Sequence, residues 1–187
     1  MTERLERVGT EINPSELENE TLAFLHRYWK DKRGTRTMPS RADIKASELK
    51  EHLGWIIFME VLPDYSDFRY KLIGTLVNQY YLSDSTGKTV TEAFAQQSDG
   101  SAKAVAAMFR KCARDRVVVY AFGEAGWIGK GFEKFECISL PLSDDGETVN
   151  MILHAFVFDR PSVMLAREMA RANGGVLPDV PSPRTAA

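Results

Sequence analysis

The sequence predicts an α+β domain built on one antiparallel sheet, with its helices gathered on one face. Two observations support this fold class. Apolar residues alternate with a period of two in several short segments, as they do in strands, and recur with a period near 3.6 in other segments, as they do in amphipathic helices. The predicted order is one helix, two strands, several helices and three strands. With 187 residues, 44% of them hydrophobic, the chain can bury the core of one such domain.

The first predicted element is a helix over residues 13–36, which follows a disordered segment at 1–12. Asn13 can cap this helix, Pro14 suits its first turn and Glu16 completes a capping box. Helical spacing gathers an apolar stripe on one side of the helix: Leu17, Thr21, Phe24, Leu25 and Tyr28. Two interpretations of the stripe remain open, because it can pack on its own domain or pair with a second copy of the chain.

Two strands joined by a short turn follow the helix, and we expect them to form a hairpin. The strands are predicted at 55–61 and 68–75, and the residues between them, 63–67, are turn formers. Alternation divides the second strand between two faces, with Phe68, Tyr70 and Leu72 on one face and Arg69 and Lys71 on the other.

The rest of the chain predicts helices first and strands afterwards. Helices are expected at 76–82, 90–95 and 101–114. Strands are expected at 117–122, 132–142 and 149–158. The sheet domain is therefore predicted over 37–160, followed at 161–187 by a C-terminal helix and a disordered tail. The basic residues near the end of the helix at 101–114 are interpreted as a complement to its macrodipole and not as a phosphate site.

Composition excludes several classes of function. The net charge of −2 and the pI near 6.0 give no electrostatic footprint for nucleic acid. The two cysteines lack the spacing of a zinc site or a disulfide framework, which favours a reducing compartment. The charged N-terminus lacks the apolar core of a signal peptide, and the longest apolar run, at 149–158, is too short to span a membrane. We therefore expect a cytoplasmic protein without membrane insertion.

Several motifs resemble a family of bacterial single-domain PAS-like proteins, in which a PAS fold forms most of a short chain without an attached output domain. The motifs include Asp67-Phe-Arg-Tyr-Lys-Leu-Ile-Gly-Thr75, Thr86-Gly-Lys88 and Leu140-Pro-Leu-Ser-Asp-Asp-Gly146. The resemblance covers about residues 22–158. It implies a five-stranded sheet in the spatial order 2-1-5-4-3, with helices over one face. It implies little about a ligand, because a fold does not fix a function.

No segment carries a complete catalytic or phosphate-binding motif. The glycine-rich segment 123–131 fails as a phosphate loop, because five residues separate Gly123 from Gly129 and Gly131 replaces the hydroxyl that would hold magnesium. No Ser/His/Asp order, HExxH motif or pair of catalytic carboxylates stands out. We therefore expect neither enzymatic activity nor a metal site.

Cofactor binding through a histidine or a cysteine is the main alternative. His26 is expected in solvent and His52 at a helix end, which leaves His154, in an apolar strand, as the candidate haem ligand. An isolated strand histidine is more often simply hydrogen-bonded. Cys112 and Cys137 lie outside the Asn-Cys-Arg motif of flavin photosensors. The basic neighbours of Cys112 favour a reactive thiol, whereas its place on an apolar stripe favours an inert one.

These observations predict a stand-alone PAS-like signalling module that acts by protein–protein interaction, as a homodimer and with a signalling partner such as a kinase. The expected interaction surface consists of Phe24, Leu25, Tyr28 and Arg69. The alternative is a sensor that binds a small molecule, haem or flavin between sheet and helices, although the sequence requires no cofactor. The expected pocket residues, for which core packing is the other role, are Met59, Tyr70, Tyr80, Tyr81, His154 and Trp127.

Overall fold

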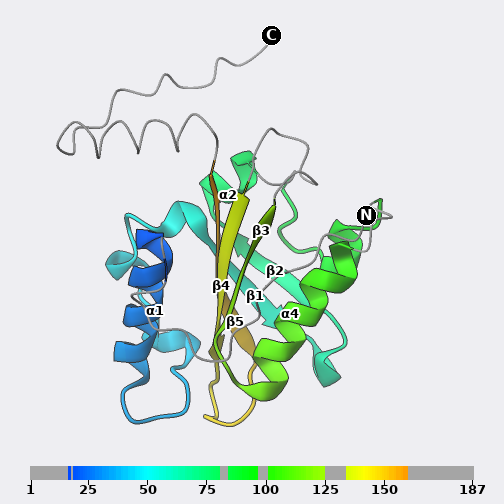
Figure 1. Ribbon diagram of the computed structural model, residues 1–187. Coiled ribbons are helices and arrows are strands. Elements are labelled where there is room, and N and C mark those ends of the chain that lie inside the picture. Colours follow the sequence, from blue (N-terminus) through cyan, green and yellow to red (C-terminus); the bar gives the residue numbers. More distant parts are fainter. Residues whose placement is uncertain (1–16, 18, 81–83, 97–100, 125–133, 160–187) are drawn as a thin grey trace, which may run out of the picture.

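One five-stranded antiparallel sheet in the order β2-β1-β5-β4-β3 forms the centre of the protein (Figure 1). The computed structural model describes residues 17, 19–80, 84–96, 101–124 and 134–159. The strands are β1 (Ile56–Val61), β2 (Phe68–Ile73), β3 (Val119–Glu124), β4 (Lys134–Leu142) and β5 (Met151–Asp159). The predicted class, strand order and hairpin are confirmed.

The α-helices of the described residues fall before the sheet and between its second and third strands, as predicted. The α-helices are α1 (Glu20–Arg33), α2 (Thr75–Tyr80), α3 (Val90–Ala93) and α4 (Ser101–Asp115). Short 3-10 helices occur at η2 (Arg41–Asp43), η3 (Ala46–Glu48), η4 (Leu53–Trp55) and η5 (Pro63–Tyr65). The segments predicted at 1–12 and 161–187 lie outside the described residues. Among the helices of the described part, none is both long enough and apolar enough to cross a membrane.

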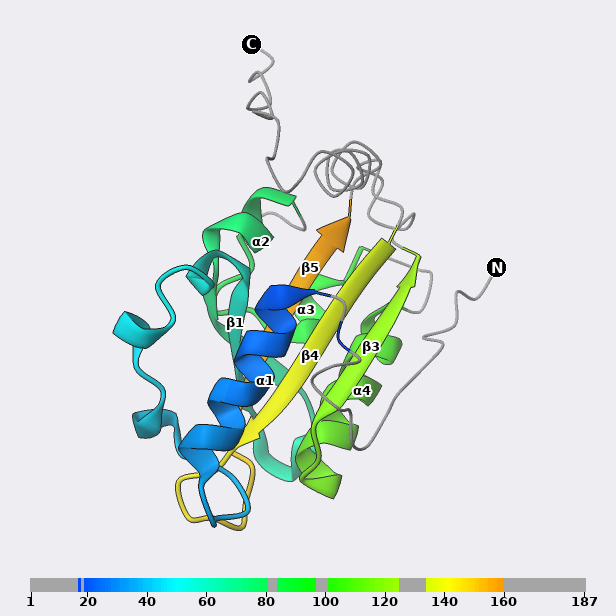
Figure 2. The ribbon, with the colours of Figure 1, turned by 60° about the vertical axis from the view of Figure 1, so that its left-hand side comes forward.

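Helices cover both faces of the sheet. α4 lies across one face, which we call the inner face, and α1 lies on the opposite, outer face (Figure 1, Figure 2). The first four residues of β1 are all buried for this reason, although successive side chains point to opposite faces. The expectation of helices on one face holds for α3 and α4, whereas the amphipathic α1 covers the other.

The N-terminal helix packs on its own sheet. It begins at Glu20, where the Asn19 side chain accepts a hydrogen bond from Thr21 N at 2.9 Å. The prediction that Asn13 and Pro14 start this helix is therefore wrong for the described part, since the chain at Leu17 is not helical. Asn19 is also a good cap, and the sequence alone offered no reason to prefer it. The buried residues of α1 are Leu22, Ala23, Leu25, His26 and Trp29.

A β-bulge interrupts the pairing of β1 with β2. Met59 pairs with Tyr70, but the preceding Phe58 pairs with Leu72, so Lys71 is an extra residue in β2. The extra residue moves the following side chains to the other face. Leu72 consequently lies on the outer face with 42% of its surface exposed, and the prediction that it shares a face with Tyr70 is wrong.

The end of β2 lies against the segment that precedes β1. A Cβ atom at Gly74 would overlap the carbonyl oxygens of Leu53 and Gly54, so a residue without a side chain is required there. Gly74 N donates to Ile56 O at 2.8 Å, and Gly74 O accepts from Asn78 N at 3.0 Å. Gly74 therefore makes the last hydrogen bond between the end of β2 and β1, and its carbonyl accepts a hydrogen bond from the first turn of α2.

Candidate functional site

The inner face of the sheet, beneath α4, is the candidate site. Strand register places Ile57, His154, Ser139 and Val119 in one row across four strands. His154 stands near the middle of this row and is only 2% exposed. Its Nδ1 lies 3.0 Å from the Ser139 Oγ, so the imidazole and the hydroxyl share a hydrogen bond. This confirms the interpretation of His154 as a hydrogen-bonded strand histidine.

Aromatic packing surrounds the imidazole. Phe109 of α4 meets the His154 ring edge to face, with 5.1 Å between the ring centroids. Burial in these surroundings lowers the pKa of His154 to about 3, partly offset by a hydrogen bond to the backbone of Ile138. The ring is therefore neutral at physiological pH, and a ligand that approached it from α4 would have to displace Phe109.

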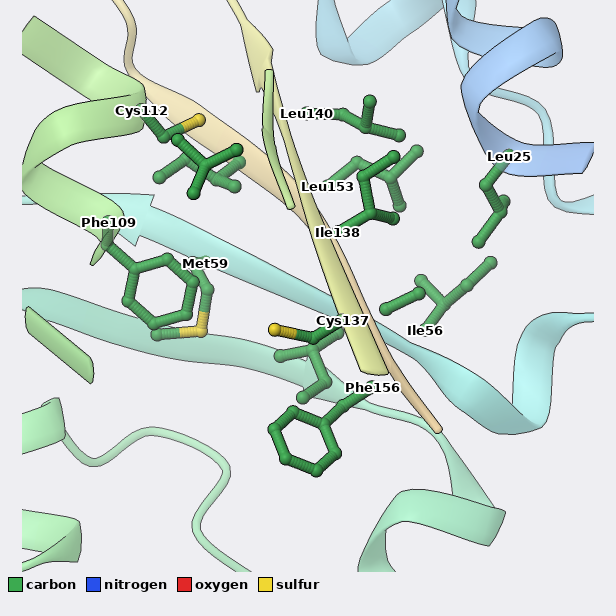
Figure 3. Packing of buried hydrophobic residues seen from close by; sticks show 14 of the residues in the cluster. Leu25, Ile56, Met59, Phe109, Cys112, Cys137, Ile138, Leu140, Leu153 and Phe156 are labelled. Atoms are coloured by element: carbon green, nitrogen blue, oxygen red, sulfur yellow. The ribbon is translucent and has the colours of Figure 1, made fainter. Parts of the chain in front are cut away.

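Both cysteines are buried between α4 and the inner face of the sheet, and both are inert. Figure 3 shows Cys112 beside Phe109 on α4 and Cys137 on β4. Cys112 donates a weak hydrogen bond to Ser139 O at 3.6 Å, and Cys137 donates one to the Met108 sulfur at 3.7 Å. Burial raises the pKa of Cys137 to about 12 and the pKa of Cys112 further still. The thiols stay protonated, so the inert interpretation of Cys112 is correct.

Three of the predicted pocket residues share the inner face. Met59 and Tyr70 pair directly across β1 and β2, both are buried, and His154 lies on the neighbouring β5. Burial, and then the charge of Asp67, raise the pKa of Tyr70 above its usual value. Of the other predicted pocket residues, the backbone of Tyr80 ends α2, while Tyr81 and Trp127 lie outside the described residues.

The contacts of His154 with Ser139 and with Phe109 were not predicted. A period of two along β4 places Ser139 on the same face as Cys137, so the alternation of the strand contained a signal for Ser139. No local pattern signals Phe109, because its contact with His154 joins residues far apart in the sequence. Within the described residues, no group of three histidine, cysteine or acidic side chains could hold a metal ion.

The predicted interaction surface on α1 is mostly used inside the chain. Leu25 is fully buried, so its assignment to an exposed surface is wrong. Phe24 is half-buried and stacks on His52, with 4.2 Å between ring centroids. The hydroxyl of Tyr28, also half-buried, donates to Glu48 Oε2 at 2.6 Å. The interpretation in which the stripe packs on its own domain therefore describes α1.

The two remaining histidines differ from the sequence expectations. His26 was expected in solvent but is 4% exposed, and burial followed by the charges of Lys30 and Arg33 lowers its pKa. His52 was expected at a helix end, a place that favours the charged imidazole. Burial instead lowers its pKa, and its Nδ1 lies 3.2 Å from the Thr21 hydroxyl.

Arg69 lies on the outer face, as predicted. Its guanidinium Nε is 3.4 Å from the carboxylate of Glu60, and Nη1 donates to Gly87 O at 3.0 Å. Lys71 reaches the same Glu60 carboxylate at 3.8 Å. All three charged side chains are more than one-third exposed, and Leu72 lies on the same strand.

Comparison with known proteins gives the family. The family model described as PAS domain matches residues 17–157, which is most of the chain. No curated protein and no solved structure matches. The matched region includes every described helix and the strands β1 to β4, and it ends within β5. The sheet order agrees with the order that the sequence resemblance implied. The chain belongs to the PAS domain family.

Proposed function

We propose that this protein is a regulatory module that acts by direct contact with other protein chains, in the cytoplasm, as a homodimer and with a signalling partner such as a kinase. PAS domains are sensory and regulatory modules in general, and they commonly mediate dimerisation and signalling contacts. They are typically not catalytic. We favour regulation by protein contact over ligand sensing because of the way side chains fill the inner face.

The observation that supports contact is the packing of α4 on the inner face. Phe109 touches both Phe68, at 5.4 Å between centroids, and His154. The polar groups beneath it are already engaged, since Ser139 binds His154 and its carbonyl accepts from Cys112. Phe109 thus fills the part of the inner face that lies over Phe68 and His154.

The surface that we assign to partner contact is the β2 patch, formed by Arg69, Lys71 and Leu72 on the outer face. Leu72 is the most exposed large apolar side chain of the described residues. Arg69 and Lys71 precede it on β2 and share one carboxylate, that of Glu60, so the patch combines an apolar side chain with excess positive charge. Apolar centres with charged rims are typical of protein–protein interfaces.

The test compares two variants of equal charge change. Leu72→Glu alters the β2 patch, whereas Ala46→Glu alters an exposed residue of η3. We expect the wild type and Ala46→Glu to be dimers by light scattering, and Leu72→Glu to shift toward the monomer mass. A wild type that stays monomeric at every concentration would exclude self-association, and an unshifted Leu72→Glu dimer would exclude this patch.

Ligand sensing is the second candidate, and one observation favours it. His154 and Tyr70 are polar side chains buried on the face that haem or flavin would have to enter. An absorption spectrum and a native mass spectrum of the purified protein separate the candidates. A bound chromophore or an added ligand mass would overturn regulation by contact alone, whereas a colourless protein at the mass of its sequence supports it.

A further inference from the structure

Helix α4 also holds the turn between β1 and β2. Arg110, one residue after Phe109, points its guanidinium at this turn. Its Nε donates to Tyr65 O at 3.0 Å and its Nη2 donates to Ser66 O at 2.9 Å. The guanidinium of Arg114, one helical turn further, lies 5.7 Å from the centre of the Tyr65 ring. The basic end of α4, interpreted from sequence as a macrodipole complement, thus has a specific structural partner.

The conformation of this turn is unfavourable for its sequence. Residues 63–66 are closed by a hydrogen bond from Ser66 N to Pro63 O at 3.1 Å. The two central residues, Asp64 and Tyr65, have φ values of 57° and 54°. Hairpin turns with positive φ at both centres favour Asn, Asp or Gly at the first centre and Gly at the second, so Asp64 fits its position and Tyr65 does not. A bulky residue at the second centre needs support from outside the turn, and Arg110 provides it.

One helix therefore contacts both the inner face and the surface turn. Phe109 touches His154 and Phe68, and Phe68 is the first residue of β2, the strand that follows the turn. A displacement of α4 that lifts Phe109 from His154 must also withdraw Arg110 from the two turn carbonyls. Packed helices move as rigid elements, so the two events share one cause.

We propose that α4 sets the conformation of the β1–β2 turn, and that loss of the Arg110 hydrogen bonds releases the turn from its left-handed state. The helix then couples the packing of the inner face to the shape of an exposed surface. This coupling is internal to the domain and needs neither the β2 patch nor a partner, so it stands or falls separately from the proposed function.

Amide hydrogen exchange of the full chain, followed residue by residue by NMR, tests the first step. The probes are the amides of Tyr65 and Ser66, which are hydrogen-bonded within the turn. We expect Arg110→Ala to speed their exchange about tenfold or more, because two hydrogen bonds from a charged donor are lost. Lys111→Ala, which removes the neighbouring cation and its ion pair with Asp115, should leave them unchanged.

Two further variants test the origin of the effect. Asp64→Gly lowers the energetic cost of the positive φ at residue 64 without removing a buried side chain. It should therefore restore slower exchange of the turn amides in the Arg110→Ala background. Phe109→Leu should speed turn exchange when Arg110 is present and add little when Arg110 is absent. The amides of β5 report whether each variant remains folded.

The results that overturn the proposal are equally definite. Unchanged turn exchange in Arg110→Ala, with β5 still protected, would show that Arg110 does not hold the turn. Equal effects of Phe109→Leu with and without Arg110 would show that the inner face reaches the turn by another route, such as Phe68. A Phe109→Leu variant that fails to fold leaves the Arg110 and Asp64 comparisons to decide.

Discussion

The two faces of the sheet are held by different kinds of interaction. On the inner face, α4 makes aromatic and sulfur contacts over one buried polar pair, His154 and Ser139. On the outer face, α1 adds a directional bond to its apolar contacts, because the indole Nε1 of Trp29 donates to Pro141 O at 2.8 Å. Filled volume therefore dominates on the inner face, whereas one hydrogen bond helps to set the position of the helix on the outer face.

The largest expected effect removes volume from the inner face. Phe109→Ala deletes a fully buried ring that contacts both Phe68 and His154, and we expect the free energy of unfolding to fall by about 3–5 kcal/mol. Phe24→Ala removes the same ring from a half-buried position on α1, so its loss of unfolding free energy should be smaller. Urea denaturation of both variants provides the measurement. Equal losses would show that the two faces do not differ in this way.

Acid should weaken the inner face through His154. Its pKa is about 3 in the folded protein, whereas the ordinary histidine value of 6.5 applies to the unfolded chain. Above pH 6.5 the ring is neutral in both states. Below that pH only the unfolded state takes up the proton, so stability falls with pH until about pH 3. Between pH 7 and pH 5 we expect a loss on the order of 2 kcal/mol from this group.

The control for this pH dependence is His154→Gln, measured by urea denaturation at pH 7, 6 and 5. His26 and His52 also have lowered pKa values and remain in both proteins, so they contribute equally to the two curves. The variant should lose less stability on acidification than the wild type. Parallel curves for the two proteins would show that His154 does not resist protonation.

The smallest expected effect removes one hydrogen bond from the outer face. Trp29→Phe keeps an aromatic ring but leaves the Pro141 carbonyl without the indole donor, and should cost about 1–2 kcal/mol. Tyr28→Phe removes an exposed hydroxyl that donates to Glu48 and should cost below about 1 kcal/mol. Thermal unfolding of the two variants measures the difference. A larger loss for Tyr28→Phe would contradict the importance of the indole bond.

Local periodicity was sufficient to predict most of the elements. The helix predicted at 101–114 ends one residue before α4, and the strand predicted at 132–142 ends at the same residue as β4, because both segments are long enough to show a side-chain period. The β-bulge at Lys71 could not be predicted in this way. The alternation of apolar residues continues through it from Phe68 to Leu72, and only the pairing with β1 reveals the extra residue.

Contacts between distant segments account for what the sequence did not show in the candidate site. His26 lies between the apolar Leu25 and the charged Arg27, so local pattern does not decide its burial, which depends on where α1 meets the sheet. Arg110 and Lys111 are consecutive cations in the sequence, yet it is Arg110 that donates to the turn carbonyls of Tyr65 and Ser66. Which cation of a basic cluster finds such a partner is decided by tertiary packing.

The proline in β4 has a consequence for how α1 is positioned. β3 pairs with β4 only as far as Ser139, so Pro141 lies beyond the end of its neighbour. A proline there exposes no unsatisfied N–H, and its oxygen is left for the indole of Trp29. Sliding α1 by one turn along the sheet would separate this donor from its acceptor and bury both without partners. The shorter β3 thus leaves the Pro141 carbonyl as an acceptor for the indole of Trp29, and this hydrogen bond fixes where α1 lies along the sheet.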